Sequence, residues 1–222
     1  MKISHFTDNT IKYIIFDLDG VLVDSFSITK KAAKTALFEI GIDAQDIDFS
    51  IYQGTGEKNF ITGPCEALGK SQLSAHAINR FYEIFEELSR KELHCFKSAK
   101  PLILNLRQRN ICLAIASSSA LKKVKASLSG AGLLEDWFDV IVSGDEVTLK
   151  KPSPEIYMTA IKKLGTDSQS CLVIEDAISG ITAAKGANLR VFSVTTSFEK
   201  SRLLDAGADF VGDDILEVLD IL

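Results

Sequence analysis

The chain has 222 residues, is 46% hydrophobic and 25% charged, and carries a formal net charge of -5. This balance is typical of a soluble globular protein, so global disorder is not expected, and the length suits one large domain or a domain with a modest insert. The negative charge argues against nucleic acid as a partner. No apolar run approaches the ~20 residues that cross a bilayer, so no membrane partner is expected.

The cysteines and the start of the chain indicate the cellular setting. The four cysteines are widely spaced and include no Cys-x-x-Cys pair, so they do not predict a zinc site. The first residues are polar and lack the apolar core of a signal peptide. We therefore expect a reduced, cytoplasmic protein, and we predict a monomer or weak homodimer.

Short apolar runs divide the chain into predicted strands. These runs are Tyr13–Phe16, Ile111–Ala116, Val140–Val142, Cys171–Ile174 and Val191–Val194, with a short sixth at Phe210–Val211. The helical patterns that alternate with the later runs are Leu121–Ala131, Pro154–Leu164, Ala177–Ala187 and Ile215–Leu222. This alternation and the continuous hydrophobicity of the runs predict an α/β fold with a doubly wound, Rossmann-like parallel sheet.

The stretch between the first two runs breaks this rhythm. Residues 26–94 contain no convincing strand, whereas Ile28–Ile40 and Ala75–Glu92 follow helical patterns. Gly63-Pro64 is interpreted as a turn within this stretch. We predict an inserted all-helical domain at 26–94 and a core domain formed by 1–25 and 95–222. The linkers between them are expected near Asp24–Phe26 and Cys95–Lys100.

Two aspartates directly follow the first predicted strand, in the string Phe16-Asp17-Leu18-Asp19-Gly20. Ligands of open α/β sheets bind beyond the carboxyl ends of the strands, so Asp17 and Asp19 lie where a site is expected. Neighbouring carboxylates repel, and such a pair needs a cation or a shared proton. Magnesium held by carboxylates and phosphate oxygens meets that need. The alternative is that both are ordinary turn or cap residues.

Polar residues also mark three later predicted elements, namely Ser117-Ser118-Ser119, Lys151 and Glu175-Asp176. Each has an ordinary alternative. Serines before a helix often serve as N-caps, and an aspartate before a helix does the same. Lysines are most often solvated surface charges. The four motifs are therefore informative as an ordered set and weak individually.

Taken in order, these motifs resemble those of the haloacid dehalogenase superfamily, over a stretch from Tyr13 to about Asp214. The helical insert stands where one branch of that superfamily has a helical cap. Within that branch the chain is most similar to the β-phosphoglucomutase-like group, which includes many sugar-phosphate phosphatases. The resemblance implies a magnesium-dependent phosphatase acting on a small-molecule phosphate ester, a sugar or polyol phosphate. A sugar-phosphate mutase is the alternative.

The resemblance also implies roles for the motif residues. Asp17 is expected to attack phosphorus and form a phospho-aspartate, while Asp19 protonates the leaving oxygen and later activates the incoming nucleophile. Ser117, Ser118 and Lys151 are expected to bind phosphate. Magnesium is expected to bind Asp17, the Asp19 backbone carbonyl, Asp176 and, directly or indirectly, Glu175.

Substrate selection is expected in the insert. Mutases of this group hold the second phosphate of their substrate with an arginine, in a stretch that resembles Gly54-Thr55-Gly56-Glu57-Lys58-Asn59-Phe60. Glu57 stands at the arginine position and Lys58 follows it, so these two residues are candidate substrate contacts. A carboxylate repels a phosphate, which favours the phosphatase over the mutase.

Lysines near the second motif have a plainer interpretation. Lys122, Lys123 and Lys125 are expected to form a solvated helix face, although one of them is a candidate for the substrate entrance. Two further hypotheses remain open. A phosphorylation-dependent receiver domain uses similar residues but is about half this length and has no such insert, and a catalytically silent relative is not favoured because every core motif residue is present.

Overall fold

The computed structural model describes residues 11–52 and 56–222, so the polar start and Gly54-Thr55 of the insert lie outside the described residues. Six parallel strands form one sheet in the order β3-β2-β1-β4-β5-β6. They are β1 (Tyr13–Phe16), β2 (Cys112–Ala116), β3 (Val140–Val142), β4 (Cys171–Glu175), β5 (Arg190–Val194) and β6 (Phe210–Gly212). This order confirms the predicted doubly wound, Rossmann-like sheet.

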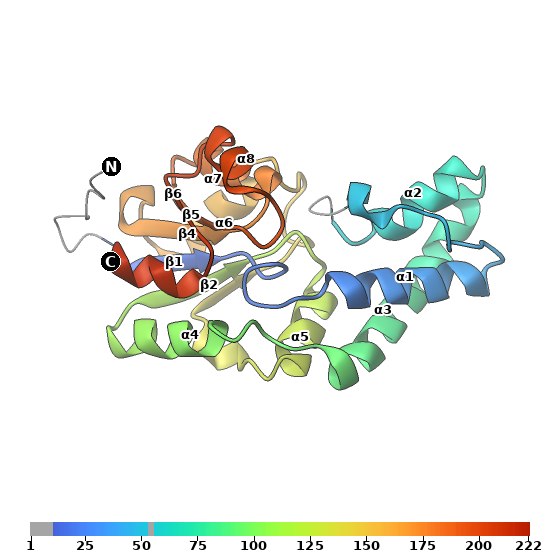
Figure 1. Cartoon of the computed structure of the whole chain (residues 1–222), viewed down its shortest axis with the longest axis horizontal. Helices are drawn as coiled ribbons and strands as arrows, with labels where there is room; N and C mark the ends of the chain where they lie inside the picture. The colour runs from blue at the N-terminus through green and yellow to red at the C-terminus, as the bar shows by residue number, and fades with distance from the viewer. Residues whose placement is uncertain (1–10, 53–55) are drawn as a thin grey trace.

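Helices cover both faces of the sheet (Figure 1). Side chains of β1 alternate between two buried clusters, with Ile14 and Phe16 in one and Ile15 in the other. The first cluster includes α4 (Ala99–Gln108), α5 (Leu121–Gly130) and the 3-10 helix Ile215–Asp220. The second includes α6 (Glu155–Leu164), α7 (Ile178–Gly186) and α8 (Lys200–Asp205). Because both faces are covered, the strands are continuously apolar.

The described part of residues 26–94 is helical. Its elements are α1 (Phe26–Glu39), α2 (Asn59–Ala67), α3 (Ser74–Glu92) and the 3-10 helices Phe49–Tyr52 and Ser71–Leu73. They lie beside the sheet-containing part, with α1 packed on α3 and α3 packed on α5 (Figure 1). We call this group the helical insert. The predicted domain limits stay a prediction.

Several predicted elements differ from the structure. The prediction of a turn at Gly63-Pro64 is wrong, because α2 continues through Pro64. Proline lacks the N–H of a helix hydrogen bond. Pro64 is buried together with Phe60 and Ile61, and this burial stabilises the helix here. The linker predicted near Cys95–Lys100 is shortened by α4, in which Pro101 falls in the first turn, where no intrahelical N–H bond is needed. The predicted helix at Ile215–Leu222 is a shorter 3-10 helix. The short helix α8 was not predicted.

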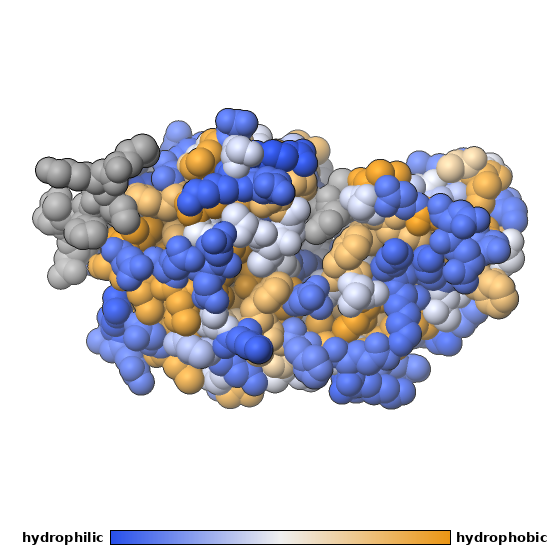
Figure 2. Space-filling view, viewed as in Figure 1, coloured by the Kyte–Doolittle hydropathy of each residue, from blue (hydrophilic) through white to orange (hydrophobic). Residues whose placement is uncertain are grey.

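Among residues 11–52 and 56–222, no helix combines the length and hydrophobicity needed to span a bilayer. Hydrophilic side chains cover much of the face seen in Figure 2, with smaller apolar patches between them. All four cysteines are free thiols.

Candidate active site

The residues after β1 form a tight turn at the carboxyl end of this central strand. The Asp17 N–H donates to the Ile174 carbonyl at 2.9 Å, and the Gly20 N–H closes the turn on the Val23 carbonyl at 2.8 Å. Gly20 has a φ of +90°, and a Cβ at this position would lie 2.0 Å from Oδ2 of Asp176. Only glycine fits here. The turn thereby brings the first motif against the acidic pair that follows β4.

Lys151 joins the first and fourth motifs. Its ammonium is buried and donates to Oδ1 of Asp17 at 2.6 Å, to Oε1 of Glu175 at 2.6 Å and to the Ala116 carbonyl at 3.0 Å. The Tyr157 hydroxyl donates to the same Glu175 oxygen at 2.8 Å. All three ammonium protons are therefore used, which is what a buried lysine requires. The alternative that Lys151 is a solvated surface lysine is wrong.

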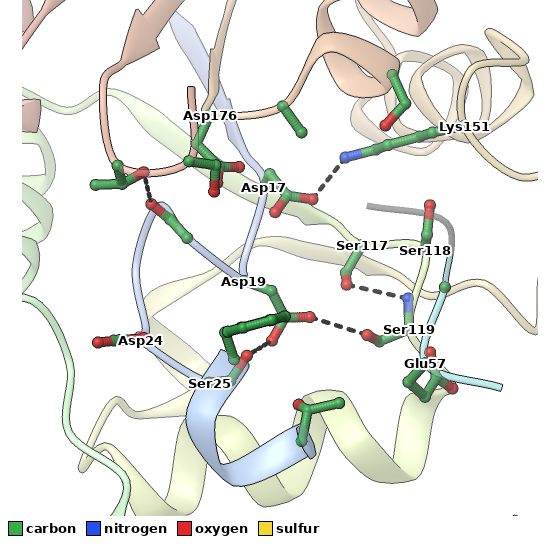
Figure 3. Close-up of a pocket in the computed structure, with 18 of the residues that line it drawn as sticks. Asp17, Asp19, Asp24, Ser25, Glu57, Ser117, Ser118, Ser119, Lys151 and Asp176 are labelled. Atoms are coloured by element: carbon green, nitrogen blue, oxygen red, sulfur yellow. Dashed lines mark hydrogen bonds and ion pairs between the residues drawn. The ribbon is translucent and has the colours of Figure 1, made fainter. Parts of the chain in front are cut away.

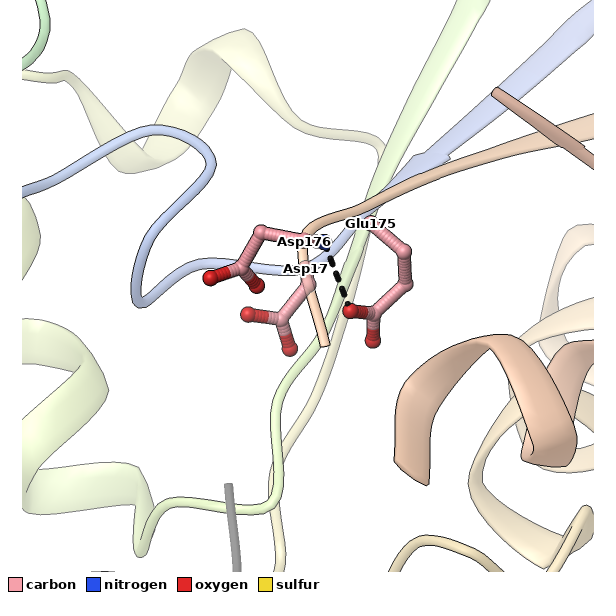
Figure 4. A group of neighbouring side chains, drawn as sticks. All are labelled: Asp17, Glu175 and Asp176. Atoms are coloured by element: carbon pink, nitrogen blue, oxygen red, sulfur yellow. Dashed lines mark hydrogen bonds between the residues drawn. The ribbon is translucent and has the colours of Figure 1, made fainter. Parts of the chain in front are cut away.

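Three buried carboxylates converge beside this lysine. Ligand oxygens of Asp17, Glu175 and Asp176 all lie within 4.8 Å of one another (Figure 4). Burial, together with Glu175 and Asp19, raises the pKa of Asp17 to about 7 even though Lys151 lowers it. Burial, Glu175 and Asp17 raise the pKa of Asp176 well above its usual value. This concentration of negative charge favours a further cation, and hard carboxylate oxygens suit magnesium.

Glu175 is the most constrained of the three carboxylates. Its Oε1 accepts from Lys151 and Tyr157, and its Oε2 accepts from the backbone N–H groups of Asp176 at 2.9 Å and Ala177 at 3.0 Å. A Cβ on Gly180 would lie 1.7 Å from Oε1, so the start of α7 packs directly against the carboxylate. Asp176 does not cap α7, because the N-cap residue is Ala177. The N-cap alternative for Asp176 is therefore wrong.

Asp19 forms a separate centre around Lys123. The Lys123 ammonium lies 2.7 Å from Oδ1 and 2.8 Å from Oδ2 of Asp19. The Ser119 hydroxyl donates to Oδ2 at 2.9 Å, and the Ser25 hydroxyl also donates to this carboxylate. Although burial opposes it, Lys123 and the two serines hold the pKa of Asp19 below its usual value. The Asp19 carboxylate therefore lies outside the three-carboxylate group.

The interpretation of Lys123 as part of a solvated helix face is wrong. Its side chain is only 2% exposed, and its ammonium lies 4.9 Å from the ring centroid of Phe85 in α3. The helical spacing contained a signal for this burial, since Ala120, Lys123 and Ser127 follow steps of three and four residues. Small residues on both sides of a lysine leave room for a neighbouring helix. All three are buried where α5 meets the insert.

The serine motif follows β2 without capping the next helix. The N-cap residue of α5 is Ala120, which has no side-chain hydrogen bond, so the N-cap alternative for the serines is wrong. Ser117 is buried, and its hydroxyl accepts from the Ser119 N–H at 3.2 Å. The Ser118 hydroxyl oxygen is buried and has no hydrogen-bond partner among the residues that the structure describes. The loop is thus held by backbone hydrogen bonds, and the Ser118 hydroxyl is available to a ligand.

A cavity of about 420 Å³ joins these groups between the core and the insert (Figure 3). Every predicted core site residue lines it, namely Asp17, Asp19, Ser117, Ser118, Lys151, Glu175 and Asp176. The insert contributes Glu57, which is buried. Lys58 does not line the cavity, because its side chain at the start of α2 is exposed. The structure therefore brings Glu57 to the candidate site and leaves the predicted contact Lys58 outside it.

We expect magnesium to raise the Tm more at pH 8 than at pH 5. Asp17 has a folded pKa of about 7 against an ordinary value of 3.8. Between these values only the folded protein keeps the proton, so this group's contribution to stability falls as the pH rises and is lowest above the folded pKa. The full loss amounts to at most about 4 kcal/mol, and a bound cation offsets it. Thermal unfolding with and without magnesium measures the effect, and an equal rise at both pH values would contradict it.

The fold and the acidic centre define a hydrolase of the haloacid dehalogenase type. The model of the haloacid dehalogenase-like hydrolase family matches residues 14–194, a stretch that contains the helical insert and all four motifs. The chain therefore belongs to this family, as the motifs indicated. Membership removes the alternative of a receiver domain.

Particular relatives and structures support this assignment. The chain is 36% identical over 217 residues to Protein SUPPRESSOR OF QUENCHING 1, chloroplastic, of Arabidopsis thaliana; the match covers 96% of this chain but only 21% of that protein. It is 30% identical over 224 residues to a phosphoglycolate phosphatase of Vibrio cholerae, covering 96% and 97% of the two chains. The crystal structure of CbbY from Rhodobacter sphaeroides in complex with phosphate superposes with a TM-score of 0.81 at 26% identity, covering 94% and 96%.

Proposed function

We propose that the chain is a magnesium-dependent phosphatase that hydrolyses a small phosphate monoester, of the sugar or polyol class, through a phospho-aspartate at Asp17. The observation that carries this proposal is the position of Asp17. Its carboxylate is bound by Lys151, lies among two other buried carboxylates and lines the cavity shared with the insert. Relatives named as phosphatases support the same reaction class.

The donor set fits magnesium. Each oxygen of Glu175 already accepts two hydrogen bonds, so we assign the ion to Asp17, Asp176 and the Asp19 backbone carbonyl, with Glu175 orienting Lys151 and the loop after β4. When bound, magnesium supplies electrostatic neutralisation of the phosphoryl oxygens and fixes the phosphorus for in-line attack. Lys151 and the serine motif hold the remaining phosphoryl oxygens.

The reaction proceeds in two displacements. A carboxylate oxygen of Asp17 attacks phosphorus, the bond from phosphorus to the leaving oxygen breaks, and Asp19 gives that oxygen a proton. Asp19 then takes a proton from water, which attacks the same phosphorus and releases inorganic phosphate from Asp17. The low pKa of Asp19 suits the second step. In the first step Asp19 must carry a proton. The anionic phosphoryl group beside Asp19 increases the affinity of this carboxylate for that proton.

The helical insert serves as the cap in this proposal. Phe60 and Glu57 of the insert line the cavity together with the core motifs, so the leaving group of an ester bound at Asp17 is expected to lie against the insert. Covering the leaving group excludes bulk water from the phospho-aspartate until the ester oxygen has departed. The cytoplasmic location and the monomer or weak homodimer stay predictions.

Phosphate release from a panel of small phosphate esters, with and without magnesium, tests the proposal. We expect phosphate release that depends on magnesium and on Asp17. p-Nitrophenyl phosphate should be among the substrates, because its leaving group needs little recognition. Release without magnesium, or no release from any ester, would contradict the proposal. A chelator control separates the bound ion from trace contamination.

A further inference from the structure

We infer that Glu57 selects esters whose leaving group carries a hydrogen-bond donor and that it rejects esters with a second anionic group. The inference rests on the proposed function, because it concerns the leaving group of an ester bound at Asp17. The donor is a hydroxyl, as in a polyol, or an ammonium, as in an amino alcohol. The rejected groups are a second phosphate and a carboxylate.

Glu57 is fixed in place by both halves of the molecule. Its Oε1 accepts from the Tyr82 hydroxyl of α3 at 2.5 Å and from the Ala120 N–H of the core at 3.0 Å. The residue is 3% exposed. Two such bonds, one from each side of the cavity, orient the carboxylate without using its second oxygen.

The second oxygen of this carboxylate is unsatisfied. Oε2 of Glu57 is buried and has no hydrogen-bond partner in the described part of the protein. Leaving a charged acceptor unpaired in this way costs on the order of 1–3 kcal/mol or more. The Ser118 hydroxyl oxygen, which belongs to the same cavity lining, is also buried without a partner. A hydroxyl or ammonium of a bound leaving group would relieve the first deficit, whereas an anionic group would worsen it.

Among the described residues that line the cavity, every cationic side chain is already paired and none is spare to offset a second anion. Among the described lining residues the cationic side chains are Lys123 and Lys151. Lys123 is paired with both oxygens of Asp19, and Lys151 is paired with Asp17 and Glu175. From the described lining residues, a second phosphate would therefore meet Glu57 without an unpaired cation; Lys150, beside Gly56, and Lys122, over the Tyr82 ring, lie outside this lining.

The rest of the insert side is neutral and aromatic. Phe26, Tyr52 and Phe60 line the cavity, with ring centroids 6.1 Å apart for Phe26 and Phe60 and 5.9 Å apart for Tyr52 and Phe60. Such a wall accepts the C–H surface of a sugar or polyol and gives nothing to an anion. Glu57 then supplies a directed polar contact, its side chain lying next to the serine motif in Figure 3.

Glu57→Gln tests the inference, because glutamine keeps an acceptor for Tyr82 and Ala120 and replaces the second oxygen with a donor. The probes are sn-glycerol 3-phosphate, phosphoethanolamine, 2-phosphoglycolate and fructose 1,6-bisphosphate. We expect the wild type to favour the first two by kcat/KM. In the variant, kcat/KM should fall about tenfold for the preferred ester and rise for the two anionic esters, as expected for one charged hydrogen bond. Comparing the first two probes distinguishes hydroxyl from ammonium recognition.

Glu66→Gln is the matched control, since Glu66 is an exposed glutamate in α2, the helix that begins just after Glu57, and should leave the profile unchanged. A wild-type preference for 2-phosphoglycolate or the bisphosphate would overturn the inference even if Glu57→Gln does not fold. So would a folded variant with an unchanged profile. Magnesium-dependent hydrolysis of p-nitrophenyl phosphate in either case would leave the proposed function standing, whereas its absence together with that of all ester hydrolysis would remove both.

Discussion

Asp17→Asn is expected to lower kcat for every ester by on the order of 10⁴-fold or more, the scale of losing a covalent nucleophile. Asparagine has nearly the same shape and keeps an oxygen that can accept from Lys151, which lies 2.6 Å from Oδ1 in the structure. The amide does not attack phosphorus, so binding survives while the chemical step is lost. Steady-state phosphate release with p-nitrophenyl phosphate and with a polyol phosphate measures the effect.

Asp24→Asn provides the matched control for this loss. Asp24 lines the mouth of the same cavity and is exposed, so the same chemical change there should leave most activity. Unfolding curves of both variants separate loss of chemistry from loss of fold. If Asp17→Asn kept a tenth of the wild-type rate, water would be attacking the ester directly and the phospho-aspartate would be excluded.

Lys123→Met is expected to lower kcat/KM for an alkyl phosphate by about 10²-fold, the lower end of the contribution of general acid–base catalysis. Lys123 holds both oxygens of Asp19, so its removal frees the carboxylate from the position in which it meets the leaving oxygen. The loss should be smaller for p-nitrophenyl phosphate, whose leaving group departs without a proton. Because kcat/KM reports steps up to the first irreversible one, the comparison isolates attack by Asp17.

The control for this variant is Lys125→Met on the same helix. Lys125 is 53% exposed in its side chain and pairs with Glu135 at 3.4 Å on the surface, an interaction of little energetic weight. Its replacement should change neither ester by more than about twofold. Equal losses for both esters in a folded Lys123→Met protein would show that Lys123 supports packing against Phe85 and does not position Asp19.

Much of the core could be predicted because its signals are local. A buried parallel strand needs a continuous apolar run, and Tyr13–Phe16 and Val140–Val142 were predicted with the bounds of β1 and β3. The acidic motifs directly follow such strands, and the carboxyl ends of parallel strands meet at one edge of the sheet. Short helices were less predictable, since α8 has only six residues and α2 contains a proline.

The sequence by itself thus determined the sheet, the helical nature of the insert and the set of core residues that meet at its edge, because strand patterning and strand-end motifs are encoded over a few neighbouring residues. Only the tertiary structure decided how those residues are paired. The contact of Lys123 with Asp19 joins positions 104 residues apart, and that of Glu57 with Ala120 joins positions 63 apart. A lysine on a helix is charged in any sequence context. Whether it is solvated or buried against a carboxylate depends on which helix packs over it, here α3.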